Sequence, residues 1–186
     1  MKSSFLVGIS GPPKSGKSTL FKRLVTTKNK NSIKNIISGS YVFNNTTFIL
    51  LDEKKEQTTS FYKDIDCLLF VCTPLQLTES ITLILQILEK KKIVILIINF
   101  IDIALKKEIL LNQPGLIRDL QIPVVFTSAF NNIGITQLKT TIFNTLSNPS
   151  LYNTSNINHS YLNLQEHSFN DYISIATQII NNNVYY

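Results

Sequence analysis

The hydrophobic residues of this chain follow two alternating patterns. Short continuous apolar runs, typical of strands covered on both faces, occupy residues 4–9, 67–72, 93–98 and 123–126. Apolar residues at helical spacing mark residues 17–26, 77–88, 105–111, 116–120 and 135–146. Because strands and helices alternate along the chain, the pattern predicts a three-layer α/β fold with a mostly parallel sheet.

One region departs from this alternation. Residues 41–43 and 48–51 flank the pair Asn44-Asn45, which suits a hairpin turn, so they are predicted to form two antiparallel strands. The polar residues 27–38, rich in Lys and Asn, predict a loop. Residues 61–66 fit no single element.

The composition changes near residue 146. We predict one folded domain at residues 1–146, a polar linker at residues 147–160 and a tail at residues 161–186. Apolar residues of the tail share one face of an amphipathic helix: Phe169, Tyr172, Ile173, Ala176 and Ile180. This helix can pack on its own domain or dock a partner, and we favour packing in cis as the commoner outcome.

The overall composition indicates a folded protein with an anionic partner. The 186 residues are 44% hydrophobic and 16% charged, and the formal charge is +6. Short lysine clusters lack the interleaved aromatic residues of a nucleic-acid surface, so a nucleotide is favoured over RNA or DNA.

Cysteine usage and hydropathy indicate the compartment. Cys67 and Cys72 are predicted to point to opposite faces of one strand, so they are expected to remain thiols, as in a reducing compartment. Neither a signal peptide nor an apolar run of membrane-spanning length is visible, so we expect a cytoplasmic location.

A glycine-rich loop follows the first predicted strand and precedes the first predicted helix. It has two glycines, Gly11 and Gly16, followed by Lys17 and Ser18, the pattern of a phosphate-binding loop. Backbone N–H groups and the helix N-terminus would hold the phosphates, Lys17 would reach the outer ones, and Ser18 would bind Mg²⁺. The predicted phosphate-binding residues are Gly11, Pro12, Pro13, Lys14, Ser15, Gly16, Lys17, Ser18 and Thr19. The alternative is an ordinary turn with a solvent-facing lysine.

Two further polar segments predict which base is bound. Asn99 and Asp102 follow the strand at residues 93–98, and an Asp there can accept two hydrogen bonds from guanine but none from adenine on the same edge. Asn99 would tie this segment to the phosphate-binding loop. After the last strand come Thr127, Ser128 and Ala129, where the Ala129 N–H is expected to meet the guanine carbonyl. The alternative for this triplet is a polar strand end that caps the next helix.

These segments resemble the guanine-nucleotide motifs of translation-factor-like small GTPases and, more narrowly, the G domain of the ferrous iron transport protein B family. The matching segments are residues 15–21, 83–89, 99–102 and 122–129, with Gly134, Ile135 and Leu138. The resemblance covers roughly residues 3–146. It implies a small-GTPase-like P-loop fold, binding of GTP and GDP with Mg²⁺, and slow hydrolysis. It also implies control of iron(II) uptake through a membrane permease domain that this sequence does not contain, at the inner face of the membrane.

Three departures from that pattern concern hydrolysis. GTPases of this class carry Asp-x-x-Gly after the third strand, where the Asp contacts the Mg²⁺ shell; here Asp52 is present but Lys55 replaces the Gly. The segment before Tyr41 is short for a first switch, and its few hydroxyls, among them Thr26 and Thr27, stand in no recognisable motif. Lys14 stands where the family has an Asn that helps hold potassium, so we expect any hydrolysis to be independent of potassium unless Lys14 simply faces solvent.

The leading hypothesis is therefore a GTP- and GDP-binding domain of iron-transport type, with degenerate switches and slow or absent hydrolysis, that regulates a membrane partner. One alternative is a non-catalytic GTP-binding module whose tail helix recruits a protein. Another is an ATP-using P-loop enzyme such as a small kinase. Against the kinase stand the position of Asn99 and Asp102 and the presence of only two arginines, Arg23 and Arg118.

Overall fold

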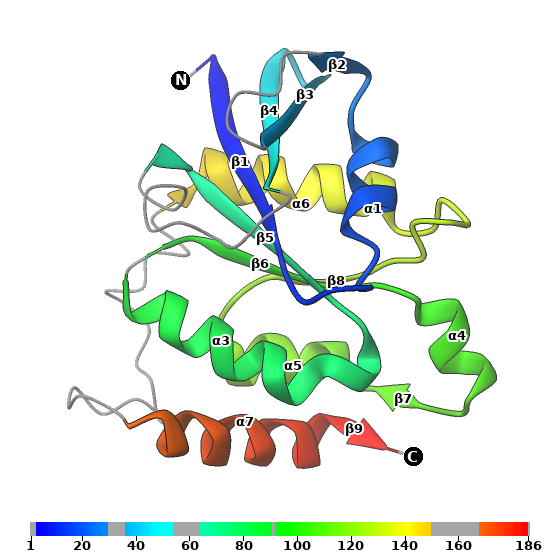
Figure 1. The fold of residues 1–186 in the computed structure, drawn as a ribbon, viewed down its shortest axis with the longest axis vertical. Coiled ribbons are helices and arrows are strands. Elements are labelled where there is room, and N and C mark those ends of the chain that lie inside the picture. The colour runs from blue at the N-terminus through cyan, green and yellow to red at the C-terminus, as the bar shows by residue number, and fades with distance from the viewer. Residues whose placement is uncertain (1–2, 30–35, 54–63, 91, 150–167, 186) are drawn as a thin grey trace.

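The computed structural model describes residues 3–29, 36–53, 64–90, 92–149 and 168–185. Within these residues, seven strands form one sheet in the order β2-β3-β4-β1-β5-β6-β8 (Figure 1). The strands are β1 (Ser4–Ser10), β2 (Thr27–Asn29), β3 (Ile36–Phe43), β4 (Thr46–Glu53), β5 (Cys67–Cys72), β6 (Val94–Ile98) and β8 (Val124–Phe126). Strands β4, β1, β5, β6 and β8 pair in parallel, whereas β2-β3 and β3-β4 pair antiparallel.

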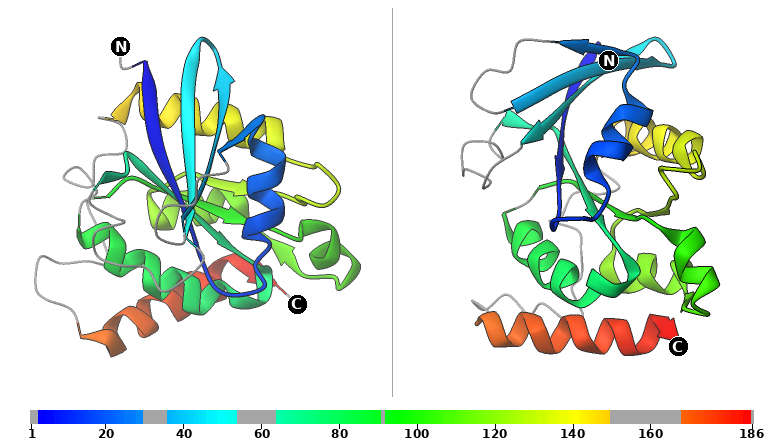
Figure 2. Two further views of the ribbon diagram at one scale, coloured as in Figure 1. Left: turned by 45° about the horizontal axis from the view of Figure 1, so that its top comes forward. Right: turned by 45° about the vertical axis from the view of Figure 1, so that its right-hand side comes forward.

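Helices cover both faces of the sheet (Figures 1 and 2). Helices α1 (Lys17–Leu24) and α6 (Ile135–Ser147) bury apolar residues in one core cluster. Helices α3 (Leu77–Glu89) and α5 (Gln113–Leu120) bury theirs in the cluster on the other face. The 3₁₀ helix η1 (Pro74–Gln76) precedes α3, and α4 (Ile101–Lys106) follows β6. This arrangement confirms the predicted three-layer α/β fold with a mostly parallel sheet.

The two cysteines behave as the strand pattern predicts. Cys67 belongs to the cluster beneath α1 and α6, and Cys72 to the cluster beneath α3 and α5. Both are buried and free. Burial raises the pKa of the Cys72 thiol to about 12, so it stays protonated at neutral pH.

Several predicted elements were wrong in their bounds. The loop expected at residues 27–38 contains β2 and the start of β3, because backbone pairing between them needs no apolar alternation at a solvent-facing edge. The helix expected at 105–111 lies earlier, as α4, and Leu110–Leu111 forms strand β7. The first helix ends at Leu24 rather than at residue 26, because Val25 has an extended backbone.

The C-terminal helix packs on its own domain. Helix α7 (Phe169–Asn183) begins with a capping box, in which Ser168 and Asp171 exchange hydrogen bonds, and it lies along α3 and α5 (Figures 1 and 2). Strand β9 (Val184–Tyr185) then pairs antiparallel with β7, a contact the apolar pattern did not predict. The domain boundary expected near residue 146 stays a prediction, since residues 150–167 lie outside the described part of the chain.

Asn183 fastens the end of α7 to the segment that leads into α5. Its carbonyl accepts the Asn112 N–H at 2.9 Å, and its side-chain amide donates to Asp119 Oδ2 at 2.8 Å. The side chain is fully buried and lies against Gly115, where an added Cβ would come within 1.9 Å of Asn183 Oδ1. These contacts hold the end of α7 against Asn112, Gly115 and Asp119.

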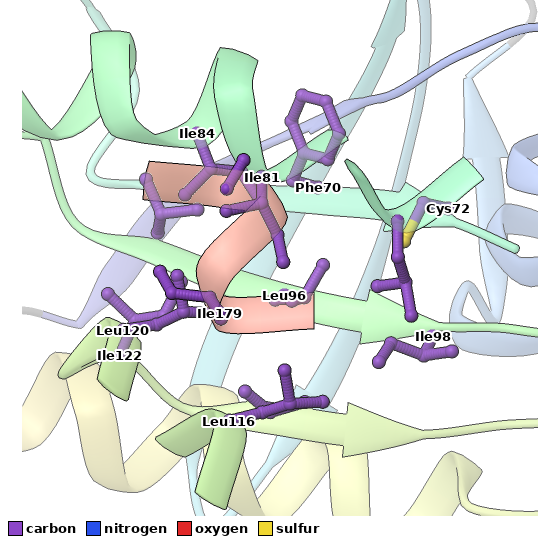
Figure 3. Close-up of a cluster of buried hydrophobic side chains, with 14 of the residues drawn as sticks. Phe70, Cys72, Ile81, Ile84, Leu96, Ile98, Leu116, Leu120, Ile122 and Ile179 are labelled. Atoms are coloured by element: carbon purple, nitrogen blue, oxygen red, sulfur yellow. The ribbon is translucent and has the colours of Figure 1, made fainter. Parts of the chain in front are cut away.

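Ile179 provides a direct test of this docking. The side chain is 1% exposed and lies in the apolar cluster with Leu120 and Ile122 (Figure 3). Ile179→Ala is expected to lower the free energy of unfolding by about 2 kcal/mol, because it removes buried methyl groups and leaves a cavity. Urea denaturation measures the change. The matched control Ile173→Ala, on the same helix but 40% exposed, should cost much less; equal, small effects would mean that α7 is not docked in solution.

Candidate nucleotide-binding site

The phosphate-binding loop, residues 11–18, connects the carboxyl end of β1 to the first turn of α1. Gly11 has φ of 135°, and a Cβ there would lie 1.9 Å from the Val71 carbonyl oxygen. Gly16 has φ of 89° and is the N-cap of α1, and a Cβ there would lie 2.2 Å from Asn99 Nδ2. Both positions therefore require glycine. The tight loop leaves the N-terminus of α1 at the end of the parallel sheet, where ligands bind in folds of this type.

Lys17 holds its positive charge at this loop. Its ammonium donates to the carbonyl oxygens of Gly11 and Pro12, each at 2.6 Å. Burial lowers the pKa of the Lys17 ammonium, and the Asp52 carboxylate partly opposes this shift by favouring the charged form. Because a half-buried ammonium gains from a nearby anion, the arrangement suits a phosphate group.

One buried side chain joins three loops. Asn99, which is 1% exposed, donates from Nδ2 to the Ser15 carbonyl oxygen at 3.0 Å. Its Oδ1 accepts from Thr127 Oγ1 at 3.1 Å and from the Ala129 N–H at 3.0 Å. The loops after β1, β6 and β8 therefore meet at a single carboxamide, as the order of the sheet allows.

This network bears on the role expected for Ala129. The sequence predicts that the Ala129 N–H meets the guanine carbonyl, yet in the structure this N–H donates to Asn99 Oδ1. To reach the guanine carbonyl, the Ala129 N–H must either share its hydrogen bond between Asn99 Oδ1 and the base or move away from Asn99. The tie between Asn99 and the phosphate-binding loop, by contrast, is present as expected.

One carboxylate oxygen of Asp102 accepts a hydrogen bond, and the other has no partner among the described residues. Its Oδ2 accepts from Asn131 Nδ2 at 3.0 Å. Its Oδ1 is buried and has no hydrogen-bond partner among the described residues. A buried carboxylate oxygen without a donor is costly, and a ligand that offers N–H donors would relieve that cost. The guanine base has two such donors on one edge, so this observation fits a guanine nucleotide.

Other residues at the site gave no signal in the sequence. Arg23 of α1 donates to the carbonyl oxygens of Ala129, at 3.1 Å, and Phe130, at 2.8 Å. Gln76 Nε2 donates to the Pro13 carbonyl oxygen at 3.1 Å. Asn131 contacts Asp102, as described above. These hydrogen bonds join residues that are far apart in the sequence, so no local pattern indicated them.

Phe100 is held in an unusual conformation. It is the N-cap of α4 with φ of 63°, a left-handed backbone that is uncommon for a bulky residue. Its ring lies close to Gly16, where a Cβ would come within 3.3 Å of the ring carbons. The surrounding contacts hold this backbone conformation, in which the aromatic ring lies against Gly16 of the phosphate-binding loop.

The predicted metal ligands lie on two neighbouring elements. Asp52, 4% exposed, is near the end of β4 in register with Ile9 of β1, and Ser18 is exposed in the first turn of α1. Among the described residues, no group of three or more His, Cys, Asp or Glu side chains could hold a metal ion. Residues 54 and 55, where the Asp-x-x-Gly motif is altered, lie outside the described part of the chain.

The remaining hydroxyl and lysine candidates are also placed. Thr26 Oγ1 donates to the Ser40 carbonyl oxygen at 3.1 Å, and the Thr27 and Ser40 hydroxyls are 2.8 Å apart. Both threonines thus take part in the pairing of β2 with β3. Lys14 is exposed and has a left-handed backbone with φ of 62°, so its side chain meets solvent at the phosphate-binding loop.

A glycine loop between β1 and α1, faced by two polar loops at the same edge of a parallel sheet, defines a P-loop α/β domain. The family model for ferrous iron transport protein B matches residues 37–142, which is more than half of the 186 residues. The chain therefore belongs to the ferrous iron transport protein B family. A search of curated proteins found no match. None of the helices in the described ranges combines the length and apolar character needed to cross a membrane.

Solved structures of the same family share the fold. The cytosolic domain of T. maritima FeoB in its GMPPNP form is 20% identical with a TM-score of 0.75, and the alignment covers 98% of this chain and 100% of that one. The same domain in its GDP form I is 19% identical with a TM-score of 0.77, covering 98% of each chain. The G domain of T. maritima FeoB is 28% identical with a TM-score of 0.65, covering 76% of this chain and 98% of that one.

Proposed function

We propose that this chain is a guanine-nucleotide-binding domain that takes GTP and GDP at the edge of the sheet where the phosphate-binding loop meets the two polar loops. The observation that carries the proposal is the buried, unpaired Oδ1 of Asp102. Asn99 ties the base segment to Ser15 of the phosphate-binding loop, so base and phosphate contacts are held at a set spacing. The GMPPNP and GDP forms of the T. maritima relative support the same ligand class.

In this proposal each group of residues has one task. Lys17 and the backbone N–H groups of residues 14–19 bind the phosphates, and Asp102 accepts from the guanine N–H groups. Residues 127–129 close the base site from the side of β8. Mg²⁺, when bound, would neutralise phosphate charge; the Ser18 hydroxyl and the Asp52 carboxylate would hold it from α1 and β4. Neither residue suffices without phosphate oxygens, so metal and nucleotide are expected to bind together.

We further propose that hydrolysis is slow or absent. Phosphoryl transfer depends on switch segments that position water and neutralise charge. Here Thr26 and Thr27, two of the first-switch hydroxyls, are engaged with Ser40 of β3. In the Asp-x-x-Gly motif that begins at Asp52, Lys55 stands in place of the glycine that GTPases of this class carry. Lys14 stands where the family has a potassium-binding Asn, and an ammonium offers no acceptor oxygen to a potassium ion, so turnover should not respond to potassium.

The biological role that follows is regulation of iron(II) uptake through a membrane partner. Membership of the ferrous iron transport protein B family supports this role, and cytosolic FeoB domains among the relatives support a cytoplasmic location at the inner face of the membrane. The buried residues of α7 already pack on α3 and α5, so these residues are not free to recruit the partner.

Titration with fluorescent analogues of GTP, GDP and ATP, followed by a single-turnover assay, tests the proposal. GTP and GDP are expected to bind with Mg²⁺ more tightly than ATP, because adenine cannot satisfy Asp102. Turnover should be slow and equal in sodium and potassium buffers. A preference for ATP would contradict the guanine site, and strong potassium activation would contradict the role given to Lys14.

A further inference from the structure

Asn131 lies beside the base-recognising carboxylate, in the loop after β8. Its Nδ2 is 3.0 Å from Asp102 Oδ2 and 3.1 Å from Ser128 Oγ. The orientation of the amide follows from chemistry, because an ionised carboxylate only accepts hydrogen bonds and must face the NH₂ group. Asn131 is therefore a donor to the one Asp102 oxygen that is engaged.

The loop that carries Asn131 is held in place by several contacts. Ser128 and Ile133 exchange backbone hydrogen bonds of 3.2 and 3.0 Å across it. Asn132 takes the left-handed turn with φ of 59°. Arg23 of α1 fastens the carbonyl groups of Ala129 and Phe130. Although Asn131 is exposed, its backbone position is thus set by the fold.

We propose that Asn131 is a specificity-determining positioning residue: it orients the Asp102 carboxylate so that Oδ1 faces the guanine base. The inference rests on the proposed guanine site. The terminal torsion of an Asp side chain is broad and weakly restricted, so a free carboxylate would rotate. One donor on Oδ2 stops that rotation, while a second lone pair of Oδ2 stays able to accept from the base.

The chemistry of the base gives this role a specific readout. Guanine has a ring N–H and an exocyclic amine on the edge that faces Asp102, whereas hypoxanthine, the base of inosine diphosphate, has only the ring N–H. A well-oriented carboxylate accepts a second hydrogen bond from the exocyclic amine, so it binds guanine more tightly than hypoxanthine. A residue that only supported the loop would affect both nucleotides equally, because they share the ribose and phosphates.

Two variants with different chemistry test the proposal. Asn131→Ala removes the donor, and Asn131→Asp keeps the shape but replaces the donor with a like charge beside Asp102. We expect GDP affinity to fall about 10-fold in Asn131→Ala and further in Asn131→Asp, and the ratio of GDP to inosine diphosphate affinity to fall several-fold in both. Asn181→Asp, an exposed position on α7, is the matched control and should change neither value.

Isothermal titration of both nucleotides with the full chain and Mg²⁺ measures these values, and thermal unfolding checks that the exposed substitutions leave the fold intact. An unchanged affinity, or equal losses for the two nucleotides, would overturn the role of Asn131. If the proposed guanine site itself were wrong, a different result would show it: the unmodified protein would not prefer GDP over ADP.

Discussion

Asp102→Asn is expected to convert the base preference from guanine to xanthine. GDP affinity should fall about 1,000-fold. The Asn side chain places an NH₂ group where the carboxylate had an acceptor oxygen, so one of the two guanine donors loses its partner and buried polar groups are left unpaired. Xanthine has a carbonyl oxygen where guanine has its exocyclic amine, so xanthosine diphosphate gains the hydrogen bond that GDP loses. The Asn131 amide, 3.0 Å from Asp102 Oδ2, should select the orientation in which the new NH₂ group takes the place of Oδ1.

Competitive titration of GDP and xanthosine diphosphate measures the exchange. Asp64→Asn is the matched control, because it makes the same substitution at an exposed residue outside the site, and it should leave both affinities unchanged. If Asp102→Asn binds GDP as tightly as the unmodified protein, Asp102 does not contact the base. A loss of GDP binding without gain for xanthosine diphosphate would point to collapse of the base segment instead.

Lys17→Ala is expected to remove most of the phosphate affinity. The half-buried ammonium donates to the carbonyl oxygens of Gly11 and Pro12, which are neutral acceptors, and a phosphate would be its charged partner. Losing a charge-assisted contact in such a site costs about 4 kcal/mol, roughly 1,000-fold in dissociation constant for GTP and GDP alike. The ratio of GDP to ADP affinity should change little, since the base contacts remain.

Lys22→Ala provides the matched control for this variant. Lys22 lies on the same helix but is exposed, so its loss should change nucleotide affinity only through long-range electrostatics, which salt screens. Equilibrium titration at two salt concentrations separates the two effects. GTP binding that survives in Lys17→Ala would mean that residues 11–18 are not the phosphate site.

Much of the fold was predictable from local pattern. The buried strands β5 and β6 are continuous apolar runs, and α3 and α6 have apolar residues at helical spacing. The local order of apolar and polar residues is therefore enough to predict these four elements. The edge strand β2 was missed because its stability comes from pairing with β3 rather than from apolar alternation. Strand β9 was missed for a related reason, since two residues have no periodicity of their own.

The C-terminal helix illustrates the limit of an amphipathic pattern. The sequence predicts a helix with an apolar face, and packing of that face in cis is favoured over a partner only because it is the commoner outcome. The structure decides the question through residues far away in the chain. Helices α3 and α5 cover the apolar face, and Asn112 and Asp119 form hydrogen bonds with the buried Asn183 at the end of α7. An apolar face indicates that the helix packs against another surface, and only the tertiary structure identifies that surface.

The candidate site divides in the same way. The sequence by itself predicted the phosphate-binding loop, because Gly11, Gly16, Lys17 and Ser18 form a short local motif, and it predicted Asn99 and Asp102 by their place after a strand. Only the tertiary structure decided that Asn99 engages the Ala129 N–H and that Asn131 reaches Asp102 across 29 positions of sequence. A hydrogen bond between distant segments depends on distance and direction in space, and short-range sequence patterns carry neither.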